Sequence, residues 1–297
     1  MSDNWQNARS APLTTLLCGW AVLAFLLFQG AKTPADLARI GYVAQYEIFG
    51  GKVHGLITMA LLHENAMHIV FNLLWFWMMG GLFERVYGTP RFALFFLTSA
   101  AVSSGLQMFD QGNAIGLSGV VYALFGFMWV ARAKEPIFGR IAHDGNARMM
   151  VGWGILCIVL TYFNILPVAN IAHGAGLAFG VLAAGILVIG REWRLSGSFA
   201  MATLVAAAVL ALLWNPKNIG WHYARIERAM AQKNYRLAES RVQFAMKSRV
   251  DQLYCLAQLA DIYEAEGRTK EYAEVDAELR ALTGQDKEKA APDLQDR

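Results

Sequence analysis

The chain has 297 residues, of which 56% are hydrophobic and only 16% are charged. Soluble domains carry about 25% charged residues, so this composition argues against an ordinary soluble enzyme and indicates a membrane protein. The net charge of +3 is too small to argue for nucleic-acid binding, and three cysteines without motif spacing argue against a disulfide framework or zinc knuckle.

Seven apolar runs are candidates for membrane-spanning helices, which need roughly 17–25 residues. They lie at about 13–30, 66–84, 92–109, 115–132, 149–166, 171–190 and 199–214. No A-x-A site follows the first run, so we expect a retained helix and not a signal peptide. The connection 31–65 is rich in glycine and aromatic residues, and its patterning predicts ordered structure. The last run is short, but it holds 16 residues without a charge, which favours a seventh span.

The second apolar run is preceded by a sequence that begins like the zinc-protease motif H-E-x-x-H. The position of the second ligand is Met67, and the next histidine, His68, lies five residues after His63. Because each helical residue turns by about 100°, these two imidazoles differ by about 140° and cannot bind one metal from a single helix face. His68 and Asn72 are four apart and share a face. They could act as a donor pair pointing into the protein or as interhelical hydrogen-bonding contacts.

The fourth run contains the sequence GLSGVVYALFG, with Ser118 at the start of the expected helix. Free backbone N–H groups and the positive end of the helix dipole favour an oxyanion at that position. The motif is not the G-x-S-x-G elbow of α/β-hydrolases, because Val120 occupies the last glycine position. A lone intramembrane serine usually bonds a carbonyl one turn back. Gly116 permits close backbone approach, and Tyr122 shares a face with Ser118.

The sixth run begins with NIAHGAGLAFG, which places His173 near the start of its helix. Small residues recur at helical spacing in the sixth and fourth runs, at Gly176 and Gly180 and at Gly119, Ala123 and Gly126. Two such faces let helices approach closely and would bring Ser118 within reach of His173. A neutral imidazole beside a serine hydroxyl is the pairing that a general base requires. No acidic residue lies at the right depth, so we predict a Ser–His dyad, with Tyr122 packing against the imidazole.

The loop charges predict the orientation in the membrane. Lys and Arg occur in the loops after the second, fourth and sixth runs, whereas the loops 110–114 and 167–170 hold none. The positive-inside rule then places the charged loops and the N-terminus in the cytoplasm, and the connection 31–65 outside. The polar groups of the three runs all lie within a turn or two of the outer surface, as expected if they form one site.

The composition changes from about Trp221, where charged residues become frequent and the pattern predicts two antiparallel helix pairs. The second pair resembles a tetratricopeptide (TPR) repeat on Leu259, Tyr263, Gly267, Ala273 and Ala277. A true repeat with a protein partner and a plain helical tail both stay open, as does the side of the membrane. We expect a membrane core at 1–198, a seventh span at 199–214, a soluble TPR-like helical domain at 215–282 and a disordered tail at 283–297.

Three motifs together resemble the rhomboid family of intramembrane serine proteases, from about Val53 to Ile189. They are HENAMHIVFN, GLSGVVYALFG and AHGAGLAFG, and ERVYGTPRF resembles the family's turn after the second span. The resemblance implies an all-α, multi-pass fold with a six-helix core, in the inner membrane of a bacterium. It also implies a serine endopeptidase that cleaves transmembrane protein substrates near their outer ends, with no cofactor and no metal.

The family's functional positions can be carried over residue by residue. They fall on Ser118 as nucleophile, His173 as general base, His68, Asn72 and the Ser118 N–H as oxyanion hole, and Gly116, Tyr122 and His63 as supporting residues. One departure is His54-Gly55, which stands where the family often has Trp-Arg and leaves the packing of the outer loop open. A non-proteolytic rhomboid-like binder or escort of membrane helices is the alternative function. A transporter is disfavoured because no inverted repeat is visible.

Overall fold

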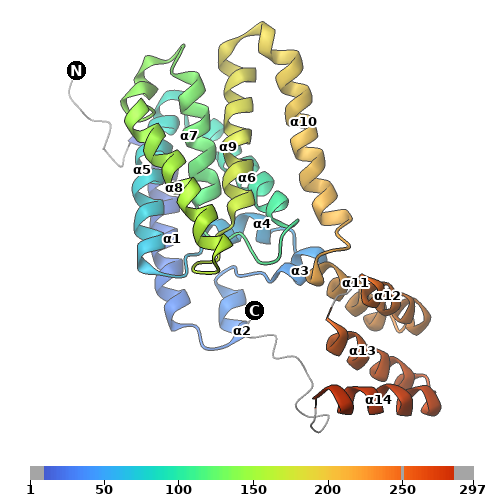
Figure 1. Cartoon of the computed structure of the whole chain (residues 1–297). Helices are drawn as coiled ribbons and strands as arrows, with labels where there is room; N and C mark the ends of the chain where they lie inside the picture. Colours follow the sequence, from blue (N-terminus) through green and yellow to red (C-terminus); the bar gives the residue numbers. More distant parts are fainter. Residues whose placement is uncertain (1–9, 249–250, 284–297) are drawn as a thin grey trace. The chain divides into compact units, whose positions relative to one another are not determined.

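The computed structural model describes residues 10–248 and 251–283, and this part of the chain is built from helices without a β-strand (Figure 1). Seven long helices coincide with the seven predicted runs. They are α1 (Pro12–Gly30), α5 (Ala66–Tyr87), α6 (Thr89–Gln107), α7 (Ser118–Ala131), α8 (Asp144–Tyr162), α9 (Asn170–Ala184) and α10 (Arg191–Leu213). The predicted all-α, polytopic fold is confirmed.

Length and composition suit four of these helices for crossing a membrane. They are α1, α5, α9 together with the π-helical turn Gly185–Ile189, and α10, whereas α7 is apolar but shorter. The seventh helix is longer than predicted, because it begins at Arg191 and runs for 23 residues. Gly190, with a φ of 131°, separates it from the preceding turn, and no proline follows until Pro216.

The structure divides into two compact units. The membrane unit consists of residues up to 43 and 54–211, and the C-terminal unit consists of residues 44–53 and those from 212 onwards. The second unit therefore takes in a short piece of the connection 31–65, which the predicted domain boundaries assign wholly to the membrane core.

Helix α7 forms the centre of the membrane unit and is almost entirely buried. It packs on α9 through glycines: a Cβ at Gly176 would overlap the carbonyl oxygen of Gly119, and one at Gly180 would overlap that of Ala123. A Cβ at Gly126 would lie 2.6 Å from the carbonyl oxygen of Leu177. The predicted contact between the two small-residue faces is confirmed, and it is closer than larger side chains would allow.

A buried carboxylate fastens α1 to the end of α5. Glu84 is 2% exposed and accepts hydrogen bonds from the Leu13 and Thr14 N–H groups, at 2.9 and 2.8 Å. It also accepts from the hydroxyls of Thr14 and Thr89, each at 2.7 Å. The first free N–H groups of α1 are thus satisfied by a side chain from another helix.

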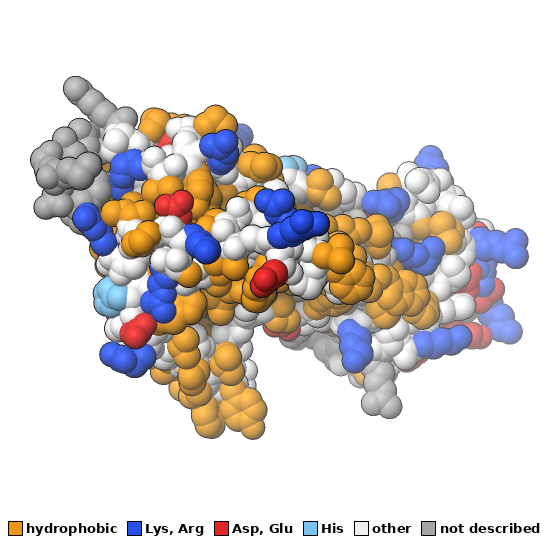
Figure 2. All heavy atoms as spheres, turned by 90° about the horizontal axis from the view of Figure 1, so that it is seen from above, with side chains coloured by type: hydrophobic (Ala, Val, Ile, Leu, Met, Phe, Trp, Pro, Cys, Tyr) orange, Lys and Arg blue, Asp and Glu red, His pale blue; other side chains and the backbone are white. Residues whose placement is uncertain are grey.

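Basic residues gather at one end of the membrane unit. The view in Figure 2 looks onto the end where α5, α7 and α9 finish and shows Lys and Arg side chains across it. The loops and helix ends there carry Arg85, Arg91, Arg132, Lys134, Arg140, Arg148, Arg191 and Arg194. The opposite end, where α5, α7 and α9 begin, carries the polar residues of the candidate site.

The connection between α1 and α5 is ordered, as its patterning predicts. It contains three short α-helices, α2 (Pro34–Arg39), α3 (Gln45–Phe49) and α4 (Gly55–Thr58), and a 3₁₀ turn at Met59–Leu61. Thr33 and Asp36 form a capping box that starts α2. Met59 and Leu62 are buried, so the last part of the connection packs into the protein before α5 begins.

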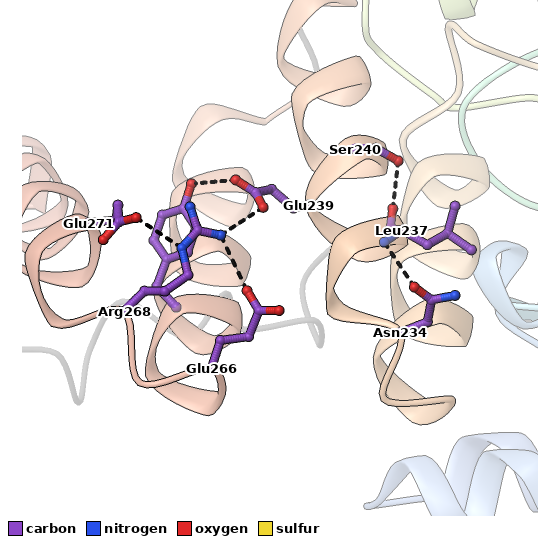
Figure 3. A network of polar contacts seen from close by, with 8 residues as sticks. Asn234, Leu237, Glu239, Ser240, Glu266, Arg268 and Glu271 are labelled. Atoms are coloured by element: carbon purple, nitrogen blue, oxygen red, sulfur yellow. Dashed lines mark hydrogen bonds and ion pairs between the residues drawn. The ribbon is translucent and has the colours of Figure 1, made fainter.

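The C-terminal unit contains the two predicted helix pairs, α11 (Ile219–Ala231) with α12 (Tyr235–Lys247) and α13 (Gln252–Ala265) with α14 (Thr269–Thr283). Asparagine side chains cap α11 and α12, as the Asn234–Leu237 hydrogen bond in Figure 3 illustrates. The resemblance to a TPR repeat stays a prediction. Of the tail predicted to be disordered, residues 284–297 lie outside the described residues.

Arg268 ties these two helix pairs together (Figure 3). Its guanidinium donates to Glu239 of α12 at 2.9 Å and to Glu266 and Glu271 at 3.2 and 3.0 Å, and it lies over the ring of Tyr263. The Tyr263 hydroxyl donates to the other oxygen of Glu239 at 2.9 Å. These carboxylates, Glu239 first, raise the pKa of Arg268.

Candidate active site

The two residues predicted to form the dyad lie next to each other. The Oγ of Ser118, the first residue of α7, is 2.8 Å from Nε2 of His173 in the first turn of α9. With the imidazole in the Nδ1–H tautomer, the serine hydroxyl donates to Nε2, which is the geometry that general-base activation needs. Ser118 is partly exposed, whereas His173 is 8% exposed.

The ring of Tyr122 holds the imidazole from one side. The Tyr122 and His173 rings are stacked, with centroids 4.7 Å apart and planes inclined by 26°. The Tyr122 hydroxyl donates to the Met150 carbonyl of α8 at 3.0 Å, so the ring is fixed at both ends. Nδ1 of His173 has no hydrogen-bond partner among the described residues, and no carboxylate completes a triad there.

The loop before Ser118 passes under His68. Gly116 has a φ of 99°, and a Cβ there would lie 2.6 Å from Nε2 of His68, so only glycine suits both the backbone and the space. The Gly116 N–H donates to the Met59 carbonyl at 3.1 Å. His68 is half-buried beside this loop, against Gly116, which lies two residues before Ser118.

His63 supports the same loop from the connection. Its Nε2 lies 3.5 Å from the Leu117 N–H, which donates to it, and its ring meets that of His68 edge-on with centroids 5.0 Å apart. Burial, with a smaller contribution from His68, lowers the pKa of His63 to about 3. The imidazole is therefore neutral at ordinary pH and can accept the bond at Nε2.

Asn72 is the predicted site residue whose contact differs most from expectation. It is buried, but its amide donates to the His68 carbonyl one turn back in its own helix, at 2.9 Å. A side-chain amide has two N–H donors, so this bond leaves the second one for another acceptor. This contact lies within one helix, so it is not the interhelical bond that was one of the two alternatives for Asn72, and the role of Asn72 as an inward-pointing donor stays a prediction.

Sequence reasoning missed Gln107, the last residue of α6. Its side chain is 3% exposed, and its Oε1 accepts the Ala172 N–H at 3.0 Å, directly before His173. The bond satisfies a free N–H group at the start of α9 and fixes the turn that carries the imidazole. A glutamine at the end of an otherwise apolar run was the signal that could have pointed to it.

A small cavity adjoins the serine. Its polar lining comes from Ser103, Ser104 and Ser118, and the remainder from small or apolar residues, including Ala60, Gly119 and Ala172. It gives the Ser118 hydroxyl a polar neighbourhood inside an apolar bundle, of a kind that can admit water. No group of three potential metal ligands among His, Cys, Asp and Glu occurs in the described part of the chain.

The part of the chain that holds this site is similar to known proteins. Residues 50–190 match the rhomboid domain. The rhomboid protease GlpG of Pectobacterium atrosepticum is 35% identical over 179 residues, which cover 59% of this chain and 63% of the relative. That of Photorhabdus laumondii is 32% identical over 189 residues, covering 61% and 64%, and that of Yersinia pseudotuberculosis is 37% identical over 131 residues, covering 43% and 46%.

The chain carries a region, residues 50–190, that is similar to the rhomboid domain. Its matches cover less than two thirds of these relatives' own length. All the residues of the candidate site, from His63 to His173, lie inside the matched rhomboid domain. Together with the apolar helices, this similarity identifies the chain as an integral membrane protein.

Proposed function

We propose that this protein is an intramembrane serine endopeptidase that cleaves transmembrane segments of membrane proteins with a Ser–His dyad. The observation that carries the proposal is the 2.8 Å approach of Ser118 Oγ to His173 Nε2, between two helices held together through glycine faces. The names of the relatives, rhomboid proteases, support the reaction class. The dyad needs no cofactor.

The chemistry is acyl transfer. Ser118 Oγ attacks the substrate carbonyl carbon while its proton passes to Nε2 of His173. The C–N bond then breaks, and the same proton moves to the leaving amine. A water molecule attacks the resulting ester and gives a proton to Nε2. The ester C–O bond then breaks, Nε2 returns that proton to Ser118 Oγ, and the acid product is released. Tyr122, stacked on the imidazole, keeps Nε2 directed at the hydroxyl throughout.

The oxyanion of each tetrahedral intermediate requires donors near Ser118. We assign this role to the His68 side chain, the second N–H of Asn72 and the backbone N–H of Ser118 at the start of α7. Gly116 allows His68 to approach, because its missing side chain leaves space for the imidazole. The N-terminus of α7 adds its dipole in the same place.

The charge distribution supports a membrane orientation for this reaction. The basic end of the membrane unit lies where α5, α7 and α9 finish, and the dyad lies near their beginnings. By the positive-inside rule, the basic end and the N-terminus face the cytoplasm and the dyad lies below the outer surface. Substrates would be cut near their outer ends, in the inner membrane of a bacterium.

The competing proposal is a rhomboid-like protein that binds or escorts membrane helices without cleaving them. Both candidate catalytic side chains are present and in contact, which favours the protease, since binding alone requires neither. The two functions are separated by serine reactivity.

A fluorophosphonate probe tests the proposal on the full chain in detergent or liposomes. We expect wild-type protein to be labelled and to cleave a single-span reporter, and Ser118→Ala and His173→Ala to do neither. Ser10→Ala, in an exposed position, serves as the control and should behave as wild type. Persistent labelling of Ser118→Ala, or unchanged reporter cleavage by it, would refute the assignment.

A further inference from the structure

A short helix from the connection between α1 and α5 belongs to the C-terminal unit. Residues 44–53, which contain α3, group with the chain from residue 212 onwards and not with the membrane unit that surrounds them in sequence. Helix α3 packs on α11, and Ile48 of α3 is 4% exposed. One segment of the connection therefore belongs to a unit whose other residues follow it by more than 150 positions in the sequence.

Three contacts attach this segment to α11. The Asn218 side chain, which also caps α11, donates to Oε1 of Gln45 at 3.1 Å. The Arg228 guanidinium donates to the Gly50 carbonyl at 2.9 Å. A Cβ at Gly220 would lie 3.2 Å from the backbone nitrogen of Tyr46, so α11 meets α3 at backbone distance.

The position of the end of α10 is consistent with the packing of α3 on α11. Helix α6 ends at Gln107, and a Cβ at Gly105 near that end would lie 3.2 Å from Cβ of Ala208, near the end of α10. The two helices therefore finish at the same end of the membrane unit, which is the end where α5 begins. The chain that follows α10 emerges on the side of the α1–α5 connection.

We infer that the C-terminal helical unit lies on the same side of the membrane as the α1–α5 connection and that its α11 face is the docking site for α3. Under the proposed orientation, this is the outer side. The partner of the α11 face is the segment 44–53 of the same chain. Docking of this segment fixes that part of the connection to the C-terminal unit.

The docked segment lies a few residues before groups that contact the serine loop. After residue 53 the chain forms α4 and reaches Met59, which accepts the Gly116 N–H, and then His63, which accepts the Leu117 N–H. An effect of docking on cleavage rests on the proposed function. The docking and its side do not, and the experiments below measure them without enzyme activity.

A disulfide pair tests docking and sidedness together. In the full chain with Cys18, Cys157 and Cys255 replaced by alanine, we expect Tyr46→Cys with Gly220→Cys to form a disulfide in cells without added oxidant. Disulfides form in the bacterial periplasm and not in the reducing cytosol. The matched pair, Tyr46→Cys with Ala231→Cys, places the second thiol about 16 Å further along α11, at 1.5 Å per residue, and should stay reduced. Free thiols in the first pair, or equal oxidation of both, would overturn the inference.

Hydrogen exchange provides a measurement that does not depend on a substitution at the crowded contact. We expect amides of residues 44–53 to exchange several-fold faster in Arg228→Ala than in wild type. Arg236→Ala, which removes an exposed arginine from α12 of the same unit, should leave them unchanged. Equal exchange in wild type and Arg228→Ala at these amides would contradict docking.

Thiol labelling tests the side separately. In the same cysteine-free chain, a membrane-impermeant maleimide should label Leu237→Cys in intact spheroplasts, as it labels Gly112→Cys in the loop before α7. Lys134→Cys, at the basic end, should be labelled only after permeabilisation. If Leu237→Cys, like Lys134→Cys, were labelled only after permeabilisation, the unit would lie on the opposite side of the membrane and the inference would be overturned.

Discussion

Gly176 of α9 faces the carbonyl of Gly119 in α7 so closely that a Cβ added to it would overlap that carbonyl oxygen. Gly119 directly follows Ser118, and Gly176 lies one turn after His173. The distance between the two catalytic candidates is therefore set by the absence of a methyl group at this position.

Gly176→Ala should separate α7 from α9 and lower both stability and activity. Overpacking typically costs about 1–3 kcal/mol, and because backbone rather than a flexible side chain must move, we expect a loss at or above the upper end. Thermal unfolding in detergent and reporter cleavage measure the effect. Gly174→Ala is the matched control on the same helix, since a Cβ there meets nothing within 4 Å. Equal behaviour of the two variants would contradict the packing argument.

Gln107 should act as a positioning residue for His173. Gln107→Leu leaves the buried Ala172 N–H without its acceptor, which typically costs about 1–3 kcal/mol. We expect a reduced rate of fluorophosphonate labelling together with a lower melting temperature. Gln107→Glu retains an acceptor oxygen for the Ala172 N–H but places a carboxylate beside that of Asp110, so it should lie between wild type and Gln107→Leu. If the two variants are labelled equally slowly, the hydrogen bond from the Ala172 N–H does not account for the positioning of His173.

Asn72→Ala should lower kcat with little effect on KM, because an oxyanion donor acts on the transition state. Removing one such donor typically costs about 2.7–4 kcal/mol, or roughly 10²–10³ in kcat. Steady-state cleavage of a single-span reporter measures the split. Asn113→Ala, in the loop before Ser118, should retain wild-type kcat. A raised KM with unchanged kcat for Asn72→Ala would assign the side chain to substrate binding.

Glu84→Ala should destabilise the attachment of α1. The variant leaves the Leu13 and Thr14 N–H groups and two hydroxyls without their acceptor, and hydrogen bonds to charged groups contribute about 1.5–3 kcal/mol each. We expect a melting temperature well below wild type for alanine and a smaller decrease for Glu84→Gln, which keeps one acceptor oxygen. Glu192→Ala, an exposed glutamate at the start of α10, should change little.

The lowered pKa of His63 predicts that the protein loses stability in acid. Its pKa is about 3 in the folded protein because burial disfavours the charged form, against an ordinary value near 6.5. Above about pH 6.5 neither state binds the proton. Below it, the unfolded chain binds a proton that the folded chain excludes, so the free energy of unfolding falls by at most about 1.4 kcal/mol per pH unit until pH approaches 3.

The His63→Gln variant removes this titration. Its melting temperature between pH 7 and pH 5 should fall less steeply than that of wild type. His54→Gln, which replaces an exposed histidine of the same connection, should follow the wild-type curve. Parallel curves for wild type and His63→Gln would show that another group governs the acid sensitivity.

Much of this molecule could be predicted from the sequence, because helices are specified by neighbouring residues. Apolar length located all seven long helices, and alanine spacing and charge located α11 to α14 of the C-terminal unit. The glycine spacing of α7 and α9 predicted their close contact, since small residues at a repeat of four lie on one helix face. The polar residues at the beginnings of three runs predicted one shared site.

Only the tertiary structure decided which side chains meet across elements. Nothing near Gln107 in the sequence indicates that it bonds a backbone N–H 65 residues away. The His68 carbonyl, not another helix, takes the Asn72 amide, and α3 leaves its own connection to pack on α11. Local patterns fix a helix and the face it presents, because its hydrogen bonds span four residues. Its partner is fixed by the packing of all the faces together, which no local pattern contains.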